Sequence, residues 1–435
     1  MKDLACIVLC AGQGTRMKSA RSKMLHDVAG KPLCLWSLDL ATQLQAEPVI
    51  AVLGYQRELV SQILDKSVVC VTQDQQLGTG HAVQAAFKTL DNFKGRVLVL
   101  YGDTPLLGLE TLKKLCDLSA KADIAMLTST VRQPFGYGRI VRDSAGHIKQ
   151  IIEERDASEF QKNIAEINPG IYVFDADFLR KNLPNLKANN QKYEYYLTDL
   201  IADSTKPIVS IEVPEEEILG VNDLLQMARA DRILRRRINE HWMREGVQMF
   251  DYKTTYIDAQ VELAPDVILE QGVILRGLCK IAQGSRIAAY SVLQDAVVGP
   301  ECHVGPFARL RPGTVLEEGC KIGNFVEVKK SHFKKKSKAN HLAYIGDTKV
   351  GEACNIGAGT ITCNYDGLNK HETKIDDQVF VGSNTTLIAP VTLHEGSYIA
   401  AGSVITSDVP KGALGIGRAR QENKDAKSLP RNRAV

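Results

Sequence analysis

The sequence predicts an α/β domain with a doubly wound sheet, followed by a parallel β-helix. Three observations lead to this fold class. Strand-like and helical runs alternate over residues 1–222, residues 223–245 contain neither proline nor glycine, and from about residue 250 to 408 an aliphatic residue returns at every sixth position. A strict interval of six fits neither a helix at 3.6 residues per turn nor a lone strand of period two, so the repeat itself is the structural unit.

The first part alternates apolar strand-like runs at 5–10, 49–53 and 97–101 with helical runs at 33–44, 80–90 and 109–118. This alternation is typical of a sheet covered by helices on both faces. The apolar run at 4–11 is short, lacks a cleavage pattern and continues into a glycine-rich turn, so we expect a first buried strand rather than a signal peptide. No later segment is long enough to cross a membrane.

Residues 223–245 predict one long, partly exposed helix. Its apolar side chains are separated by wide charged gaps, and Gly246 supplies a C-terminal stop. We therefore predict three parts: a first domain at 1–222, a linker helix at 223–247 and a β-helix domain at 248–435. The last stretch, 421–435, is polar and basic, and we expect a loosely held tail there.

The six-residue repeat predicts the β-helix. Its aliphatic positions are Val292, Val298, Val304, Leu310, Leu316, Ile322 and Val328, and later Val381, Leu387, Leu393, Ile399 and Ile405. In a triangular coil with six residues on each side, one aliphatic side chain per side points inward and stacks on its equivalent one coil away. An aromatic content of only 6% suits such a narrow core. The repeat does not fix the handedness of the coil.

Charge and cysteine usage exclude several classes of protein. A net charge of +3 argues against a dedicated nucleic-acid binder, which carries a larger basic excess on one face. The ten cysteines form no CxxC pair and no Cys/His cluster, so we expect neither a zinc site nor a disulfide framework. They suit reduced thiols in a cytoplasmic protein.

A glycine-rich turn follows the first predicted strand in the segment LCAGQGTRM at 9–17. Backbone N–H groups in such a turn approach a phosphate or a base edge, and Arg16 and Lys23 add positive charge where a triphosphate would lie. Dinucleotide binding fits poorly, because Met17 replaces the third glycine of GxGxxG and no Walker lysine motif is present. An ordinary strand-to-helix turn is the alternative at this point.

Two further segments favour a nucleotide site. LGTGH at 77–81, preceded by Gln73, predicts a second glycine loop that opens a helix. YGDTP at 101–105 places Asp103 at the carboxyl end of a strand, where α/β sheets bind ligands. Beside two loops of phosphate size, the Asp103 carboxylate is a candidate magnesium ligand. His81 by itself is more often a cap or a core residue than a catalyst.

The aliphatic repeat breaks after Val328 for the lysine-rich stretch 329–341 and resumes near Tyr344. We interpret this stretch as an insertion, extruded from one coil, that walls off a cleft at a neighbouring subunit. A solvated loop is the alternative. Its cations suit a sugar phosphate and the phosphates of coenzyme A. Histidine side chains have an unperturbed pKa of about 6.5, which suits His341 to removing a proton from an amine near neutral pH.

In their order, these motifs resemble the family of bacterial enzymes that combine N-acetylglucosamine-1-phosphate uridylyltransferase with glucosamine-1-phosphate N-acetyltransferase. The matching blocks are LCAGQGTRM (9–17), QLGTGH (76–81), YGDTP (101–105), GYGRI (136–140), EIN (166–168), GVN (220–222), PFARLRPG (306–313), NFVEVKK (324–330) and NIGAGTITCNYDG (355–367). They cover nearly the whole chain, and their order is more specific than any single block.

The resemblance implies a Rossmann-like nucleotidyltransferase domain, a linker helix and a left-handed parallel β-helix of hexapeptide repeats. It implies acetylation of glucosamine-1-phosphate by acetyl-CoA, then Mg²⁺-dependent uridylyl transfer from UTP to N-acetylglucosamine-1-phosphate with release of pyrophosphate. The product, UDP-N-acetylglucosamine, supplies peptidoglycan and lipopolysaccharide synthesis. The implied assembly is a cytoplasmic homotrimer that acts on small molecules, without nucleic-acid binding or membrane insertion.

Carried over position by position, the resemblance assigns residues to the uridylyl site. For UTP and the sugar nucleotide it implies contacts from Leu9, Gly12, Lys23, Gln73, Gly78, Thr79, Tyr101, Asp103, Gly138, Glu153, Asn168 and Asn222. Among these, Asp103 and Asn222 match the pair that holds magnesium, and Lys23 with Arg16 would neutralise the phosphates and act in catalysis.

For acetyl transfer the resemblance implies His341 as the general base. The acceptor sugar phosphate would contact Arg311, Lys329, Tyr344 and Asn355. Acetyl-CoA would contact Ala358, Asn364, Tyr365, Ser383, Ala401 and Arg418.

Some positions depart from the family pattern. Asn340 precedes His341 where the pattern has glycine, and we expect it to stiffen a loop there; the C-terminal tail lacks the usual aromatic ending. Two other functions stay open. A single-activity sugar-1-phosphate nucleotidyltransferase with a structural β-helix is disfavoured by the segment around His341. A non-enzymatic scaffold is disfavoured by the intact set of Lys23, Asp103 and Asn222.

Overall fold

The computed structural model of the chain describes residues 3–190 and 193–424, so most of the predicted tail lies outside the described residues. The chain forms two compact units, residues 1–234 and 235–435, and the boundary between them falls inside the long helix α7 (Leu224–Arg244). Among the described helices, none has the length and apolar character needed to span a membrane.

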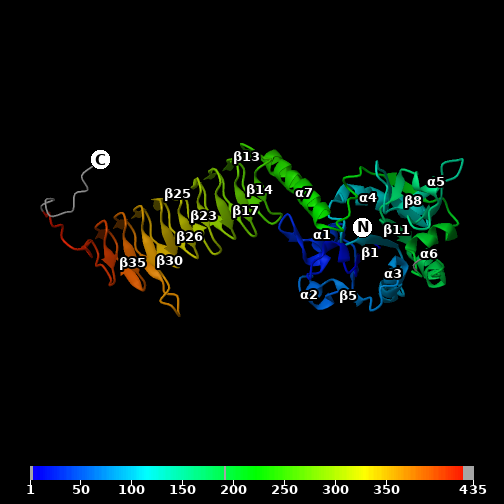
Figure 1. Ribbon diagram of the computed structural model, residues 1–435, viewed down its shortest axis with the longest axis horizontal. Helices are drawn as coiled ribbons and strands as arrows, with labels where there is room; N and C mark the ends of the chain where they lie inside the picture. Colours follow the sequence, from blue (N-terminus) through cyan, green and yellow to red (C-terminus); the bar gives the residue numbers. More distant parts are fainter. Residues whose placement is uncertain (1–2, 191–192, 425–435) are drawn as a thin grey trace, which may run out of the picture. The chain divides into compact units, whose positions relative to one another are not determined.

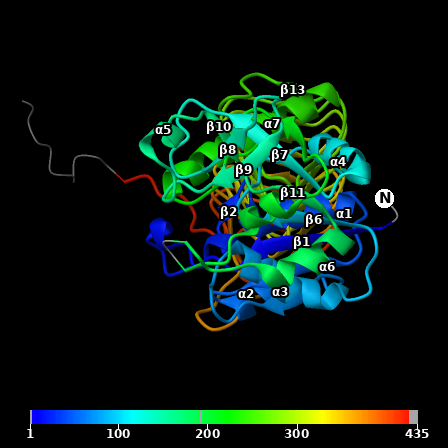
Figure 2. The ribbon, with the colours of Figure 1, turned by 90° about the vertical axis from the view of Figure 1, so that its right-hand side faces the viewer.

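A mixed sheet of ten strands, counted over the described residues, forms the centre of the first unit (Figure 2). Its order is β5 (Val69–Thr72), β4 (Val49–Leu53), β1 (Leu4–Cys10), β6 (Arg96–Tyr101), β11 (Tyr172–Asp175), β7 (Ile124–Thr130), β10 (Glu166–Asn168), β8 (Gly138–Arg142) and β9 (Ile148–Ile152), with β12 (Val209–Glu212) paired to β7. The first four strands are parallel, and β11 runs antiparallel to both of its neighbours.

Helices cover both faces of this sheet, so all seven residues of β1 are buried. Cys6 and the side chains on its face of β1 pack with α1 (Leu33–Gln43) and α4 (Leu109–Leu118). Ile7 and the alternate side chains pack with α3 (Thr79–Phe87) and α6 (Ala176–Asn182), which lie together beside β1 in Figure 2. Continuous apolar character is what a strand buried on both faces requires.

The predicted strands and helices of the first unit are present with small shifts. β4 and α4 have the predicted bounds, β1 and β6 begin one residue earlier, and α1 ends one residue earlier. Helix α3 begins at Thr79 and ends at Phe87, and a 3₁₀ turn, η3 (Lys88–Leu90), completes the predicted run. The unit also contains the short helices α2 (Arg57–Ser61) and α5 (Glu159–Lys162).

None of the predicted strand-like runs covers the antiparallel part of the sheet. Strands β10 and β11 both pair antiparallel with β7, and only residues 169–171 separate them, so they are two segments of one extended stretch. Pro169 has no N–H to donate, and Gly170 has a φ of +85°, so the ladder is interrupted between them. This interruption divides the stretch into strands of three and four residues.

The order of the parallel strands fixes the position of the first candidate site. The chain passes from β1 to β4 and β5 on one side, then returns to β6 on the other side of β1. Leu9 and Tyr101 are direct partners near the carboxyl ends of β1 and β6. The loops that follow these strands therefore leave the same edge at a topological switch point, where open α/β sheets bind ligands.

The C-terminal half of α7 belongs to the second unit and packs against the β-helix. Ile238 and Trp242 contact its core, and the buried Asn239 side chain donates hydrogen bonds to the carbonyl groups of Tyr252 and Thr255 at 2.8 and 2.9 Å. The helix ends at Arg244, and Gly246 follows with a φ of +91°, the left-handed region that favours glycine.

Three parallel sheets build the β-helix of the second unit (Figure 1). The first sheet contains β13 (Gln248–Met249), β16 (Ile268–Leu269), β19 (Arg286–Ile287), β22 (His303–Val304), β25 (Lys321–Asn324), β28 (Lys338–His341), β31 (Asn355–Ile356), β34 (Phe380–Val381), β37 (Tyr398–Ile399) and β39 (Leu414–Gly415). The second contains β14 (Tyr256–Ile257), β17 (Ile274–Arg276), β20 (Val292–Gln294), β23 (Arg309–Leu310), β26 (Glu327–Lys329), β29 (Tyr344–Gly346), β32 (Ile361–Cys363), β35 (Thr386–Ile388) and β38 (Val404–Ile405). The third contains β15 (Glu262–Leu263), β18 (Lys280–Ile281), β21 (Val297–Val298), β24 (Val315–Leu316), β27 (His332–Phe333), β30 (Thr348–Val350), β33 (Thr373–Ile375) and β36 (Val391–Leu393). Three consecutive strands make one coil.

The predicted aliphatic repeat fills the core of the β-helix, with one shift. Val298, Val304, Leu310, Leu316, Ile322 and Val328 are each at most 1% exposed. Val292, predicted to start this run, begins strand β20 on the outer surface, and Leu293 fills the core instead. Both residues are aliphatic, so the pattern alone does not distinguish them.

The interpretation of 329–341 as an extruded insertion is wrong. Strands β26 to β29 continue the coil, with Phe333, Ala339 and Ile345 as its buried residues. The repeat looks broken because the interval from Val328 to Phe333 is five residues. The segment that leaves the coil is 364–372, between β32 and β33, and Figure 1 shows it as the orange loop that projects from the β-helix.

Phe333 is the largest side chain in this part of the β-helix core and is fully buried. We expect Phe333→Ala to lower the free energy of unfolding of the second unit by about 3–5 kcal/mol, because the narrow prism cannot close over the cavity. Denaturant unfolding followed by circular dichroism measures this loss. The neighbouring outward variant His332→Ala should lose less than about 1 kcal/mol, and equal losses in the two variants would contradict the assigned core.

Candidate functional sites

Lys23, Asp103 and Asn222 form a polar cluster at the carboxyl ends of β1 and β6. The Lys23 ammonium group lies 2.5 Å from Asp103 Oδ2 and 3.3 Å from Asn222 Oδ1. Lys23 is only 6% exposed, and the N–H of Val221 donates to the carbonyl of Asp103 at 2.8 Å, which holds Asn222 next to it. The fold thus brings together three candidate residues from distant parts of the sequence.

The donor atoms of this cluster suit a divalent cation. The side-chain oxygens of Asp103 and Asn222 already converge on one positive charge, the Lys23 ammonium group. One carboxylate and one amide oxygen are enough for an ion that takes its other ligands from water and phosphates. The described residues contain no group of three or more His, Cys, Asp or Glu side chains that would cage a structural metal.

Close backbone packing shapes the glycine loop after β1. Gly14 has a φ of +66°, and a Cβ added there would lie 2.8 Å from Cβ of Lys23. A Cβ added to Gly54 would lie 2.5 Å from the carbonyl oxygen of Ala11. Gly12 has no neighbouring atom within 4 Å of an added Cβ, so its backbone faces open space that a ligand can fill.

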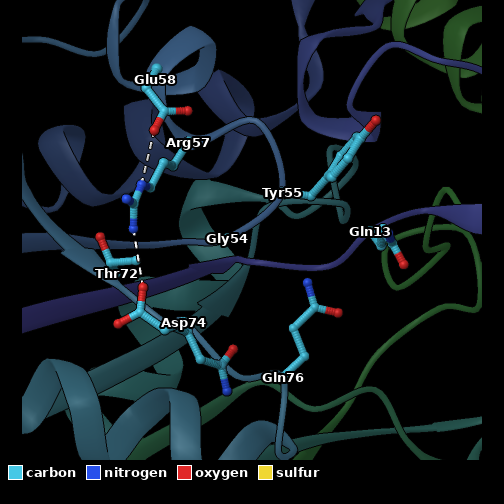
Figure 3. Close-up of a pocket in the computed structure, with 9 residues that line it drawn as sticks. Gln13, Gly54, Tyr55, Arg57, Glu58, Thr72, Asp74 and Gln76 are labelled. Carbon is cyan, nitrogen blue, oxygen red and sulfur yellow. Dashed lines mark hydrogen bonds and ion pairs between the residues drawn. The ribbon is translucent and has the colours of Figure 1, made fainter.

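A pocket of about 260 Å³ opens beside this loop (Figure 3). It is lined by Gln13, Gly54, Tyr55, Arg57, Glu58, Thr72, Gln73, Asp74 and Gln76. Arg57 is held by ion pairs to Glu58 at 3.0 Å and to Asp74 at 3.1 Å. In Figure 3 these ion pairs lie on one side of the pocket, and the amides of Gln13 and Gln76 lie on the other. The amides supply the few placed polar groups that fix a ligand's orientation.

Gln73 connects this pocket to the second glycine loop. Its Nε2 donates to the carbonyl of Gly78 at 3.1 Å and lies 3.0 Å from Nδ1 of His81. Gly78 has a φ of +105° and precedes α3, and the Thr79 hydroxyl accepts a hydrogen bond from the N–H of Leu197 at 3.1 Å. The expected glycine loop and the helix that it opens are both present.

Gln76 ties the two glycine loops together, because its Nε2 donates to the carbonyl of Ala11 at 2.7 Å. We expect Gln76→Leu to raise the KM for the nucleotide about tenfold with little change in kcat, since one hydrogen bond contributes about 0.5–1.5 kcal/mol. The matched control is Gln75→Leu, whose exposed side chain does not line the pocket. Steady-state kinetics that give both variants the same KM would contradict this positioning role.

Tyr101, Glu153 and Asn168 form a second group near the carboxyl end of β6. A Cβ added to Gly170 would lie 2.5 Å from the Tyr101 ring, and the N–H of Gly170 donates to Asn168 Oδ1 at 3.0 Å. Oε1 of Glu153 lies 3.5 Å from a Cβ added to Gly138. Burial, together with the negative charges of Glu153 and Asp103, raises the pKa of Tyr101 well above its usual range. Tyr101 is therefore a neutral hydroxyl that can donate to a sugar or phosphate oxygen.

On the β-helix, His341 is oriented by a partner on the preceding coil. It is the last residue of β28, and its Nδ1 lies 2.8 Å from Oδ1 of Asn324, its direct register partner on β25. A carbonyl oxygen only accepts hydrogen bonds, so Nδ1 carries the proton and Nε2 keeps its lone pair. Asn340 belongs to the same strand, so the expectation that it stiffens a loop is wrong.

Asp347 is the centre of a second polar cluster. It accepts a hydrogen bond from the side-chain amide of Asn364, and the ammonium groups of Lys329 and Lys330 lie 3.5 and 3.8 Å from its carboxylate. Lys370, from the loop 364–372, faces Lys329, and this contact and charge lower the pKa of Lys370. Several cations around one carboxylate leave an excess positive charge that suits a phosphate group.

Arg311 and Tyr344 extend this cluster across the second sheet. Arg311 Nη1 lies 2.8 Å from Oε1 of Glu327, and Glu327 is the register partner of Tyr344. A Cβ added to Gly346 would lie 2.6 Å from the Tyr344 hydroxyl and 3.0 Å from the side-chain nitrogen of Asn364. The predicted acceptor residues Arg311, Lys329 and Tyr344 therefore share one surface.

A stack of turns continues along the edge of the β-helix from His341. Backbone hydrogen bonds join Gly359 N–H to Leu342 O at 3.0 Å, Asn384 N–H to Ala358 O at 2.7 Å and Gly402 N–H to Ser383 O at 2.8 Å. Ala358, Ser383 and Ala401 thus follow His341 on successive coils, and Cδ of Arg418 lies 3.7 Å from a Cβ added to Gly402. An extended ligand laid along this edge would meet these residues in order.

Some candidate residues lie apart from the group to which the resemblance assigns them. Arg16 is exposed in η1 (Thr15–Met17), and the described residues give it no ion pair. Asn355 is on the first sheet as the register partner of Lys338, away from the acceptor surface of the second sheet. Asn364 is 7% exposed and bonded to Asp347, and Tyr365 is 60% exposed on the loop 364–372. Within one chain, neither of the last two lies on the edge that continues from His341.

Sequence reasoning missed the side chains that hold the candidate residues in place. They are Gln76, Thr198, Asn324, Asp347 and Lys370. Thr198, for example, donates to Oε1 of Glu153 at 3.3 Å. Gln76 and Asn324 stand inside the motif blocks, but only the register across coils shows that Asn324 faces His341.

Two family models match separate parts of the chain. A MobA-like NTP transferase domain matches residues 6–167, and a bacterial transferase hexapeptide model of six repeats matches residues 295–330 and 372–407. These matches confirm the predicted Rossmann-like nucleotidyltransferase domain followed by a left-handed parallel β-helix of hexapeptide repeats, with which the three parallel sheets agree.

Curated relatives match the chain over nearly its full length. The chain is 45% identical to "Bifunctional protein GlmU" of Pelobacter propionicus, over 98% of both chains. It is 44% identical to the protein of the same name from Geotalea uraniireducens, over 99% of both, and 44% identical to that of Caldanaerobacter subterraneus subsp. tengcongensis, over 98% of this chain and 97% of the relative. Both domains are thus present together in these relatives.

Proposed function

The chain belongs to the family of bifunctional GlmU proteins, and on this premise we propose that the residues described above carry its two transfer reactions. The protein is a nucleotidyltransferase and an acetyltransferase that synthesises UDP-N-acetylglucosamine. Its hexapeptide-repeat domain acetylates glucosamine-1-phosphate with acetyl-CoA, and its first domain transfers the uridylyl group of UTP to N-acetylglucosamine-1-phosphate. The family requires a divalent metal, and we assign Mg²⁺ to Asp103 and Asn222.

The observation that carries the uridylyl assignment is the convergence of Asp103 and Asn222 on the Lys23 ammonium group beside two glycine loops. Bound Mg²⁺ would supply Lewis-acid stabilisation of the phosphate charge. Lys23 would neutralise the phosphates of UTP, and Arg16 would add a second cation from its exposed position. The backbone around Leu9, Gly12, Gly78 and Thr79, together with Gln73, would hold the uracil, ribose and phosphates.

The sugar phosphate is the nucleophile in uridylyl transfer, so no covalent protein intermediate is needed. A phosphate oxygen of N-acetylglucosamine-1-phosphate attacks the α-phosphorus of UTP, the bond to the β-phosphate bridging oxygen breaks, and pyrophosphate leaves. Tyr101, Gly138, Glu153 and Asn168 would position the sugar. Because positioning and charge supply the rate enhancement, the site contains cations and glycines rather than a nucleophilic side chain.

In acetyl transfer, the amine of glucosamine-1-phosphate attacks the thioester carbonyl of acetyl-CoA. Nε2 of His341 accepts the amine proton, the C–S bond breaks, and the thiolate of coenzyme A leaves and takes up a proton. Arg311, Lys329 and Tyr344, with Asn355, would hold the sugar phosphate. Ala358, Ser383, Ala401 and Arg418 would bind coenzyme A along the edge, with Asn364 and Tyr365 contributed through the projecting loop.

Asn324 acts as a positioning residue for His341. We expect Asn324→Ala to lower acetyl turnover about tenfold with unchanged KM values, because the imidazole loses the partner that fixes its tautomer. Asn324→Asp should retain turnover at high pH, but its carboxylate favours the protonated imidazolium, so the acidic limb of the pH profile should move to higher pH. Identical pH profiles for the wild type and Asn324→Asp would contradict this role.

We assign a homotrimer of cytoplasmic location as the working state. Exposed aromatic residues support an interface between copies: Tyr290, Phe307 and Phe325 stack with ring centroids 5.4 Å apart, and each is about half exposed. Leu368, on the loop 364–372, is 89% exposed. Sedimentation equilibrium should give three times the mass of the chain, and an active acetyltransferase monomer would contradict the assignment.

The decisive assay for the overall function supplies the pure protein with glucosamine-1-phosphate, acetyl-CoA, UTP and MgCl₂. Mass spectrometry should detect UDP-N-acetylglucosamine, pyrophosphate and free coenzyme A. When UTP is omitted, the reaction should stop at N-acetylglucosamine-1-phosphate. When acetyl-CoA is omitted, the glucosamine-1-phosphate should remain unchanged. Product formation without acetyl-CoA would contradict the proposed order.

A further inference from the structure

A groove on the outer side of α3 has the properties of a second ligand site on the first unit. Its volume is about 470 Å³, within the range of small-molecule pockets. It is lined by His81, Gln84, Ala85, Phe87, Lys88, Asp91, Arg180, Leu183 and Pro184. None of these residues has a role in the two transfer reactions assigned above.

The groove lies between α3 on one side and α6 with η5 on the other, and one hydrogen bond joins its two walls. His81 and Ala85 lie one turn apart on a single stripe of α3, and Lys88 follows at the next helical spacing as the first residue of η3. The opposite wall comes from the end of α6 and from η5 (Leu183–Asn185). The Gln84 side chain donates to the carbonyl of Leu183 at 2.7 Å and so fixes the two walls relative to each other.

The chemistry of the walls defines the class of ligand. Phe87, Ala85, Leu183 and Pro184 provide an apolar surface, and the guanidinium group of Arg180 lies 5.8 Å from the centre of the Phe87 ring. Arg180 pairs with Asp177 and donates from Nη2 to the carbonyl of Phe93 at 2.7 Å, so Lys88 is the cation that an anionic ligand would meet. Lys88 makes no ion pair within the described part of the chain, and Asp91 is the one acidic residue in the lining. A planar apolar body with one anionic group matches these walls.

His81 connects the groove to the nucleotide pocket. Its Nδ1 lies 3.0 Å from Nε2 of Gln73, and an amide nitrogen only donates, so Nδ1 is the acceptor and Nε2 of His81 carries the proton. That N–H is available to an anion in the groove. Gln73 in turn lines the pocket beside the glycine loop and holds the carbonyl of Gly78.

We propose that this groove binds a planar apolar organic anion, and that its occupation weakens UTP binding through His81 and Gln73. A ligand that hydrogen-bonds to Nε2 of His81 pulls on the ring, and the ring position sets the orientation of the Gln73 amide. Binding at the two sites is then coupled, and the coupling is reciprocal. The ligand site stands on the groove alone, whereas the coupling rests on the proposed uridylyl function.

The test uses 8-anilinonaphthalene-1-sulfonate, a fluorescent planar anion, with the full chain. We expect saturable binding that Ala85→Trp, which fills the groove, and Lys88→Glu, which reverses the cation, each weaken at least tenfold. The matched controls are Ala120→Trp and Lys94→Glu, which place the same changes on exposed positions outside the groove. Unchanged uridylyl and acetyl activities in the absence of the probe show that all four variants are folded. Equal binding by the groove variants and their controls would overturn the site.

The coupling has its own readout. The probe should raise the KM for UTP several-fold in the wild type, should have no effect on uridylyl transfer by Ala85→Trp, and should leave acetyl transfer unchanged. If the probe binds in the groove but the KM for UTP is unchanged, the proposed coupling is wrong and the ligand site still stands. A protein that binds the probe but has no uridylyl activity without it would overturn the proposed function instead, so the two failures are distinct.

Discussion

Asp103→Ala should lower uridylyl transfer by at least about 10³-fold and leave acetyl transfer close to the wild-type rate. Asp103 supplies the carboxylate oxygen of the proposed metal site. It also pairs with Lys23, which is nearly buried, so its removal leaves that cation without its carboxylate partner. Both losses act on the same reaction. No residue of the acetyl site is altered, because every one of its candidates lies beyond residue 300.

Two controls separate this prediction from a general loss of structure. Asp117→Ala, on the exposed side of α4, should keep both activities. Asp103→Asn preserves the shape of the side chain but removes its charge, so it should also fail in uridylyl transfer. Radioactive or coupled assays of the two reactions on the same preparation give the ratio of uridylyl-transfer activity to acetyl-transfer activity directly. A folded Asp103→Ala protein that loses both activities equally would contradict two separate sites.

His341→Ala should lower acetyl turnover by about 10²–10⁴-fold, with little change in the KM for acetyl-CoA. The prediction rests on the hydrogen bond between Nδ1 of His341 and Asn324, which leaves Nε2 as the proton acceptor. Uridylyl transfer should continue at the wild-type rate. His332→Ala removes another exposed imidazole from the same region, and it should retain acetyl turnover because His332 pairs with Glu317 instead.

The kinetic pattern of His341→Ala separates a base from a binding residue. A base affects the chemical step, so kcat falls and KM stays. A residue that only holds the sugar phosphate would raise KM while leaving kcat nearly unchanged. The latter result would assign His341 to binding and leave proton transfer to water.

The sequence predicted elements with strong periodicity and missed those that depend on contacts far along the chain. Strand β4 and helix α4 have the predicted bounds, because apolar periodicity is decided locally. The predicted strands do not include β10 and β11, because Pro169 and Gly170 divide the stretch that contains them. The lysine-rich stretch resembles an insertion because a single interval, from Val328 to Phe333, is shortened to five residues and looks like a break in the repeat.

The candidate sites follow the same division. Lys23, Asp103 and Asn222 were found from motifs, and their oxygen and nitrogen atoms meet in the structure. Asn324 and Asp347 were not found, because their importance depends on which residue stands one coil away. Which residues face each other on neighbouring coils depends on the number of residues in every side and turn between them. The spacing of the motifs does not give these numbers.

A complementation assay tests most directly the claim that one chain carries two independent transfer sites. Asp103→Ala and His341→Ala are each supplied with glucosamine-1-phosphate, acetyl-CoA, UTP and MgCl₂, separately and as an equimolar mixture, and the products are quantified by mass spectrometry. Alone, Asp103→Ala should accumulate N-acetylglucosamine-1-phosphate and His341→Ala should leave the glucosamine-1-phosphate unchanged, whereas the mixture should restore UDP-N-acetylglucosamine. A mixture that forms no UDP-N-acetylglucosamine, although Asp103→Ala accumulates the acetylated intermediate, would contradict the account.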